Sequence, residues 1–295
     1  MSTPRTVGMI GIGLMGHGIA RNLAPHYPLV LLDHPGNQPL DALLAAGARV
    51  VRSAREVAAE ADVLILCVTG SPQVEAVLLG PHGALPSLKA GAVVIDCSTA
   101  IPSSTDKVAK AVQAAGGRFL DAPMTRTPKE AHEGRLNLLV GGDKALFDEC
   151  QPLLATFAEN ITHCGPTGAG HRMKLLHNYV SLGFITLLAE AAACADRAGV
   201  APDVFADVLA KGGGGGAALE RLRPYITARD TSGIRFSISN AHKDLGYYTT
   251  MAQETGAAHR MADATHATLA QALAASTPDT LLPELVTLLA SPSAS

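Results

Sequence analysis

The stretch VGMIGIGLMGHGIA, residues 7–20, decides the fold. It places Gly11, Gly13 and Gly16 in the order G-x-G-x-x-G, between a short apolar run and a helical pattern. In a dinucleotide-binding βαβ unit, the first glycine permits a tight turn and the second lets the backbone approach a pyrophosphate. The third lets the helix pack closely on the strand. Because the first N–H groups of that helix would face the phosphates, the stretch predicts a dinucleotide site.

An acidic residue follows at the expected distance. Asp33 ends the next apolar run, PLVLLD, 22 positions after Gly11. A carboxylate there accepts hydrogen bonds from ribose hydroxyls and repels a 2′-phosphate, so it predicts NAD rather than NADP. The alternative is a glycine-rich turn followed by an incidental aspartate. The βαβ context favours the dinucleotide site.

The hydrophobic pattern divides the chain into two parts. Up to about residue 166, apolar runs such as ADVLILCV, GAVVIDCS, RFLDAP and LNLLVGG alternate with helical stretches. Repeated βα units of this kind predict a doubly wound, Rossmann-type sheet. Beyond the Gly- and Pro-rich segment HCGPTGAG, only helical patterns follow. We therefore predict an α/β NAD-binding domain over 1–166 and an all-helical domain over 167–295.

Composition excludes several classes of function. The chain has 295 residues, 47% of them hydrophobic and 17% charged, which indicates a globular protein with a large core. A net charge of −3 gives no general affinity for nucleic acid or for an anionic membrane. The five cysteines are widely spaced without a CxxC pair, so neither a disulfide scaffold nor a metal site is expected. With no signal peptide or membrane span expected, we predict a cytoplasmic protein.

Polar residues follow three of the predicted strands. In an open α/β sheet, ligands bind at the carboxyl ends of the strands, which makes these residues candidates for the site. Serine and threonine are also common helix caps and turn residues, and the last of these segments also fits a solvated surface loop. The candidates are Val68 and Thr69, then Ser98 and Thr99, then Thr125, Arg126 and Thr127.

A long helix is predicted from Gly170 to about Gly199. Its start carries Lys174 and Asn178, which lie four residues apart and so share a face. His171 and Ser181 extend this polar stripe, whereas the segment 179–195 is apolar on nearly all sides and is expected to be buried. A lysine beside a buried segment is costly unless it is paired or used in chemistry. The alternative is a solvated first turn, with Lys174 reaching water.

These motifs together resemble the β-hydroxyacid dehydrogenase family, which includes 3-hydroxyisobutyrate dehydrogenase and tartronate semialdehyde reductase. GMIGIGLMGHGIARNL resembles its cofactor motif, including Leu14 and Met15, and DCST resembles the strand end whose threonine, here Thr99, meets the cofactor. GAGHRMKLLHNYV resembles its catalytic motif. The resemblance implies that Lys174 is the catalytic acid and base and that Asn178 binds substrate, both in an interdomain cleft. It also implies that Lys243, in AHKDLGYY, reaches the cofactor side of that site, and that the long helix builds a homo-oligomer.

One segment departs from the family pattern. After DAP the family usually has Val-Ser-Gly-Gly, whose small residues hold the substrate carboxylate, whereas this chain has Met124, Thr125, Arg126 and Thr127. Family members with an arginine near this place resemble reductases of sulfonated aldehydes. We therefore expect hydride transfer between NAD and a small β-hydroxy acid or an anionic semialdehyde, with Arg126 on the anion. The alternatives are a sulfonated-aldehyde reductase, an imine reductase, a non-catalytic nucleotide-binding module, and a surface ion pair of Arg126 with Glu130 or Glu133.

Overall fold

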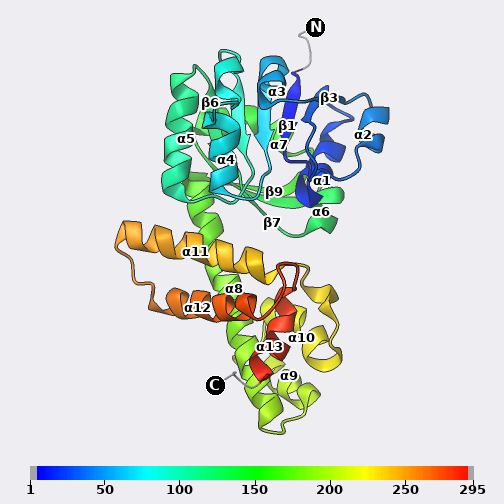
Figure 1. Ribbon diagram of the computed structural model, residues 1–295, viewed down its shortest axis with the longest axis vertical. Helices are drawn as coiled ribbons and strands as arrows, with labels where there is room; N and C mark the ends of the chain where they lie inside the picture. The colour runs from blue at the N-terminus through cyan, green and yellow to red at the C-terminus, as the bar shows by residue number, and fades with distance from the viewer. Residues whose placement is uncertain (1–4, 292–295) are drawn as a thin grey trace. The chain divides into compact units, whose positions relative to one another are not determined.

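The computed structural model describes residues 5–291, and the chain divides into two compact units, Met1–Lys174 and Leu175–Ser295 (Figure 1). The first unit is an α/β domain and the second is helical. The first unit extends past the predicted division at 166 because the first turn of the long helix packs on its sheet.

Six parallel strands form the centre of the sheet in the first unit. Their order is β3-β2-β1-β4-β5-β6, the usual order for a dinucleotide-binding sheet. The direction of winding reverses between β1 and β4, so the carboxyl ends of these two strands flank the place where such sheets bind a nucleotide. The strands are β1 (Val7–Ile10), β2 (Leu29–Leu32), β3 (Arg49–Val51), β4 (Val63–Leu66), β5 (Val93–Asp96) and β6 (Arg118–Asp121).

The sheet continues beyond β6 with a change of direction. Strand β8 (Leu136–Gly141) is antiparallel to β6 and to the short β7 (Met124–Thr125), and β9 (Ala158–Gly165) pairs parallel with β8. The runs RFLDAP and LNLLVGG form strands as predicted, but no apolar pattern indicated β9. It pairs with β8 alone, and most of its residues are exposed or half-buried. A half-solvated strand of this kind needs no continuous apolar run.

Helices cover both faces of this sheet (Figure 1). Strand side chains alternate between two cores, with Val7 and Met9 in one and Ile10 and Leu64 in the other. Residues of α1 (Leu14–Leu23), α2 (Asp41–Ala45), α6 (Pro128–His132) and α7 (Lys144–Leu154) complete the first core. Residues of α3 (Ala54–Glu60), α4 (Ser71–Leu79) and α5 (Pro102–Ala114) complete the second.

The second unit confirms the predicted change to an all-helical fold. Helix α8 (Ala169–Arg197) starts in the first unit and continues into the second. Between Leu175 and Ser291, the described residues form helices and 3₁₀ turns, with one isolated bridge between Ser237 and Leu281. The remaining helices are α9 (Pro202–Ala210), α10 (Ala217–Ala228), α11 (Ile238–Thr255), α12 (Arg260–Ala274) and α13 (Leu285–Ala290).

The expected burial of the apolar segment 179–195 is only half correct. Leu182, Ile185 and Leu188 are buried in the core of the second unit, but Leu176, Val180, Phe184 and Leu187 are exposed, Leu187 by 61%. A single chain covers one side of α8 and leaves this apolar stripe uncovered. Among the described helices, α8 is also long and apolar enough to cross a membrane by length and composition alone, and 44% of its apolar 18-residue window is buried.

Candidate active site

Two glycines of the first turn are required by the fold itself. Gly11 has φ +95°, and a Cβ on it would lie 2.2 Å from the carbonyl oxygen of Cys67. A Cβ on Gly16 would lie 1.9 Å from the carbonyl oxygen of Gly11. Both distances are far shorter than any real contact, so the turn between β1 and α1 closes only with glycine at these positions.

Gly13 differs from both. Its φ of −72° suits any residue, and a Cβ there would meet no atom of the described part of the chain within 4 Å. The fold therefore does not need glycine at this position. Gly13 is the N-cap of α1 and makes no side-chain cap bond, while Leu14 beside it is 63% exposed. Open space at a helix N-terminus is what a pyrophosphate needs, so this turn fits a dinucleotide.

Asp33 lies at the end of β2, at the same edge of the sheet. Its N–H donates to the carbonyl oxygen of Val51 over 2.8 Å, and the side chain is exposed. No residue in the described range 5–291 donates a hydrogen bond to its carboxylate. Asn37 closes the following turn by donating from Nδ2 to the carbonyl oxygen of Leu32 over 2.9 Å. The Asp33 carboxylate is thus available to ribose hydroxyls.

A hydrogen bond joins the segments that follow β4 and β5. The N–H of Val68 donates to Oγ of Ser98 over 3.0 Å. This contact brings Val68 and Thr69 beside Ser98 and Thr99 at the carboxyl edge of the sheet. Val68 and Thr99 are half-buried and Thr69 is exposed. Their cofactor contacts stay a prediction, as do those of Leu14 and Met15.

The threonine side chains of the loop after β6 form hydrogen bonds within the first unit. Thr125 accepts a hydrogen bond from Nδ2 of Asn137 over 3.1 Å. Thr127 caps α6 in a reciprocal capping box with Glu130, and the Thr127 hydroxyl lowers the pKa of that carboxyl. The predicted substrate contacts of these threonines remain untested.

Arg126 is paired, but not with the expected partners. It forms an ion pair with Glu159 on β9 and donates to the carbonyl oxygen of Arg135. The guanidinium lowers the pKa of Glu159. The predicted alternative, an ion pair with Glu130 or Glu133, is wrong in its partners. Glu130 belongs to the capping box of α6, and Glu133 pairs with Arg135.

The backbone of Arg126 has a conformation that favours glycine. Its φ is +81°, a region that costs a non-glycine residue about 1–3 kcal/mol. The family pattern has glycine at this point of the loop. The arginine is thus held on a glycine-like backbone, with its side chain 26% exposed.

The start of α8 carries the predicted catalytic pair. Lys174 is half-buried and Asn178 is 7% exposed, four residues further on the same helix face. Nδ2 of Asn178 donates to Oδ2 of Asp244 over 2.7 Å, and Nζ of Lys243 lies 3.2 Å from Oδ1 of Asp244. Asp244, on α11, thus links two predicted site residues, Asn178 and Lys243.

Asp244 was not among the predicted residues. It is 3% exposed, and only its place in AHKDLG, on a face shared with apolar residues, could have indicated it. A carboxylate accepts and does not donate, so it fixes the Asn178 amide with its NH₂ group toward α11. The amide oxygen, 3.2 Å from Nδ1 of His177, points away from Asp244.

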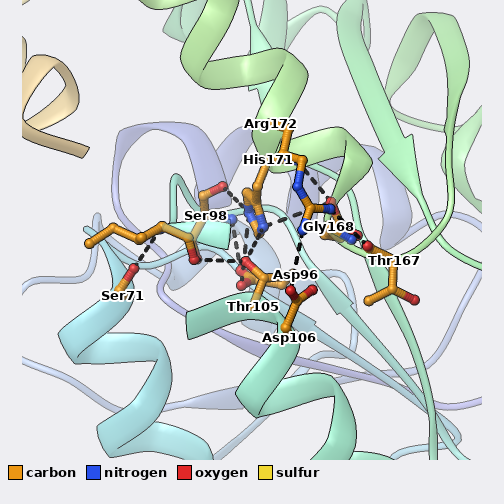
Figure 2. A network of polar contacts seen from close by, with 11 residues as sticks. Ser71, Asp96, Ser98, Thr105, Asp106, Thr167, Gly168, His171 and Arg172 are labelled. Atoms are coloured by element: carbon orange, nitrogen blue, oxygen red, sulfur yellow. Dashed lines mark hydrogen bonds and ion pairs between the residues drawn. The ribbon is translucent and has the colours of Figure 1, made fainter. Parts of the chain in front are cut away.

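His171 also differs from expectation. The sequence placed it on one polar stripe with Lys174 and Asn178, but its side chain is wholly buried in the first unit. Figure 2 shows it between Ser98, which follows β5, and Thr105, near the N-terminus of α5. It anchors the helix rather than lining its open face.

Comparison with known proteins agrees with this geometry. Residues 6–165 match the NAD binding domain of 6-phosphogluconate dehydrogenase, and residues 168–289 match the NAD-binding domain of NADP-dependent 3-hydroxyisobutyrate dehydrogenase. The chain belongs to the β-hydroxyacid dehydrogenase family. It is therefore a nicotinamide-dependent oxidoreductase that acts on the CH–OH group of small hydroxy acids or on the matching semialdehydes.

Individual relatives cover most of the chain. It is 34% identical over 241 residues to 2-(hydroxymethyl)glutarate dehydrogenase of Eubacterium barkeri, covering 81% of this chain and 80% of that one. It is also 34% identical over 264 residues to NAD-dependent L-serine dehydrogenase of Pseudomonas aeruginosa, covering 87% and 88%. The structure of Mycobacterium tuberculosis 3-hydroxyisobutyrate dehydrogenase with L-serine has a TM-score of 0.86 and 26% identity, covering 98% and 100%. An imine reductase from Myxococcus stipitatus, at 18% identity and a TM-score of 0.62, shares the fold alone.

The two kinds of glycine in the first turn predict different defects. Gly13→Ala should leave the melting temperature of the free protein unchanged, because its Cβ enters open space. It should weaken dinucleotide binding about 10–100-fold, because the methyl group blocks the close approach of the backbone. Gly16→Ala, the matched control, should destabilise the free protein by more than about 1 kcal/mol. Thermal melts and calorimetric titration with the cofactor measure both effects, and a Gly13→Ala protein with wild-type affinity contradicts the assignment.

Proposed function

We propose that this enzyme transfers a hydride between NAD(H) and a short β-hydroxy acid, or semialdehyde, that carries a strongly anionic group. The observation that carries the proposal is the pair Lys174 and Asn178 on one face of α8, in a chain whose first turn fits a dinucleotide. The relatives named above act, by their names, on 2-(hydroxymethyl)glutarate and L-serine, both of which have a hydroxymethyl group near a carboxylate.

Each residue has a distinct task in this proposal. A bound nicotinamide would accept or supply the hydride. Lys174 takes the proton from the substrate hydroxyl in oxidation and returns it to the carbonyl oxygen in reduction. Asn178 orients the same oxygen, since Asp244 fixes the rotation of its amide. Asp33, Val68, Thr69, Thr99 and Lys243 hold the cofactor.

Removing the lysine tests the chemistry. Lys174→Ala should lower kcat about 10²–10⁴-fold, the usual range for a positioned acid–base group, and leave the Kd of the cofactor unchanged. Lys110→Ala, on the exposed side of α5, is the control for the loss of a lysine. Turnover is measured with NADH and NADPH against short aldehydes, keto acids and imines. A Lys174→Ala protein that keeps wild-type turnover, or a wild-type protein active on imines alone, rejects the proposed function.

The choice of NAD rests on Asp33. Its carboxylate is exposed at the ribose end of the site, and residues 34–38 contain no lysine or arginine to neutralise a 2′-phosphate. The ratio of kcat/KM for NAD to that for NADP should exceed about tenfold, since facing like charges cost several kcal/mol. Asp33→Ser should reduce this ratio. Residues 168–289 resemble part of an NADP-dependent dehydrogenase. A wild-type preference for NADP would therefore show that Asp33 does not select the cofactor.

We propose that the substrate's anionic end binds Arg126, with Thr125 and Thr127 beside it. A guanidinium presents a planar fork of donors that matches carboxylate, sulfonate or phosphate oxygens. The competing role of Arg126 is the ion pair with Glu159, whose side chain is 48% exposed. Exposed pairs of this kind contribute little to stability, so a bound anion can compete with Glu159 for the guanidinium.

Arg126→Gly separates the two roles without adding strain, because glycine adopts φ +81° freely. The variant should lose about 10–100-fold in kcat/KM for an anionic substrate, the usual worth of a charge-assisted hydrogen bond. It should lose nothing for a matched substrate without the anionic group, and Arg126→Lys should fall between. Equal losses on both substrates, or none on either, assign Arg126 to the pair with Glu159.

We also propose that the protein is a cytoplasmic homo-oligomer. Leu176, Val180, Phe184 and Leu187 form an exposed apolar stripe along α8, which a second copy would cover. The five cysteines are unpaired, which suits a reducing compartment. Light scattering should give a mass at least twice the 30.3 kDa of one chain, and Phe184→Glu should lower it. A wild-type mass of one chain contradicts the assembly.

A further inference from the structure

A buried polar cluster lies at the start of α8, within the first unit (Figure 2). His171 has no exposed surface. Its Nε2 lies 3.0 Å from the carbonyl oxygen of Ser98, and its Nδ1 lies 2.8 Å from Oγ1 of Thr105. The imidazole thus joins α8 to the end of β5 and to the first turns of α5.

Two buried carboxylates flank the same ring. Oδ2 of Asp121 lies 3.8 Å from Nδ1, and Oδ2 of Asp96 lies 4.0 Å from Nε2. Asp96 is 1% exposed and Asp121 is 0% exposed. Oδ1 of Asp96 accepts from the N–H of Ser98, but its Oδ2 has no hydrogen-bond partner among the described residues. Each ring nitrogen therefore has a carboxylate oxygen within 4.0 Å.

The hydrogen bonds engage both nitrogens of the ring. The Ser98 carbonyl oxygen can only accept, so Nε2 carries a proton. The Thr105 hydroxyl is the partner of Nδ1, and it also lies 3.2 Å from the carbonyl oxygen of Ile101. With a partner on each side, the imidazole is held in one orientation.

The two carboxylates have no other basic partner on the first turn of α8. Burial raises the pKa of Asp96, and the neighbouring imidazole of His171 and the N–H of Ser98 counteract this rise only in part. Arg172, the next residue, pairs with Asp106 at 3.2 Å on the half-exposed side. His171 is thus the residue of this turn whose side chain lies beside both Asp96 and Asp121.

The same cluster fixes the backbone of α8. Asp121 accepts hydrogen bonds from the N–H groups of Gly168 and His171, over 2.7 and 2.8 Å. A Cβ on Gly170 would lie 2.2 Å from the carbonyl oxygen of Leu139, so the helix start is pressed against β8. Lys174 follows His171 by three residues, which is less than one turn.

We propose that His171 is a positioning residue of the active site: its buried imidazole, held by Ser98 and Thr105, locks the first turn of α8 and so sets the direction of Lys174. The inference rests on the proposed role of Lys174. It assigns to His171 no contact with substrate or cofactor. Its effect is on the rate of the chemical step and not on the affinity for dinucleotide.

The anchoring of His171 is tested without any substrate. ¹H–¹⁵N correlation spectra of protein with ¹⁵N-labelled histidine show the ring N–H groups, and the loss of one signal set in His171→Gln identifies the residue. Because the ring is fully buried and its Nε2–H donates to the Ser98 carbonyl oxygen, this proton should exchange with solvent far more slowly than the ring N–H of an exposed histidine. Rapid exchange of this proton overturns the inference, and this result is independent of whether the enzyme's substrate has been found.

Positioning is tested by a matched pair at Thr105. Thr105→Val removes the hydroxyl partner of Nδ1 with little change of volume, whereas Thr105→Ser keeps it. Thr105→Val and His171→Gln should lower kcat about 10–100-fold, as a small displacement of a catalytic group does, with the Kd of the dinucleotide unchanged. Thr105→Ser should retain the wild-type kcat. Wild-type kcat in Thr105→Val, or equal losses of kcat and dinucleotide affinity, rejects the positioning role. If Lys174→Ala is fully active, the proposed function fails, whatever the spectra of His171 show.

Discussion

The carboxylate of Asp121 joins the end of β6 to the start of α8, and the candidate active site depends on this joint. Its two oxygens accept the N–H groups of Gly168 and His171, which would otherwise lack intrahelical partners. The negative charge also suits the positive end of the helix dipole. Because Gly141 and Gly170 leave no room for a Cβ at this crossing, the helix has one available position. The position of Lys174 is therefore set by the packing of the helix start on the sheet.

Local patterns in the sequence were enough to predict the fold class. The glycine fingerprint, the acid 22 residues later and the apolar runs each depend on neighbours close in sequence, and the structure confirms the α/β domain and the helical domain after it. The strand β9 was missed because it is half-solvated and carries no continuous apolar run. The exposed stripe on α8 was misjudged for a related reason, since an apolar pattern does not say which chain covers it.

The site could be predicted only in part, because its connections are long-range. His171 reaches Ser98 across 73 residues, Asn178 reaches Asp244 across 66, and Arg126 reaches its carboxylate partner across 33. Residue spacing along a helix or strand contains no information about such pairs. It placed Lys174 and Asn178 on one face correctly, but it could not show that His171 turns inward or that a buried aspartate orients the asparagine.

The glycine turn separates two kinds of constraint within six residues. Gly11 and Gly16 are required by the geometry of the polypeptide, whereas no atom of residues 5–291 lies within 4 Å of the place of a Cβ at Gly13. In a library of random variants selected only for folded, soluble protein, positions 11 and 16 would therefore stay glycine and position 13 would drift. A second selection would use cells whose growth requires the enzyme's activity. The residues that disappear from position 13 in this second selection would be those that interfere with ligand binding and not with folding. The turn thus allows selection for folding and selection for binding to be distinguished by sequencing.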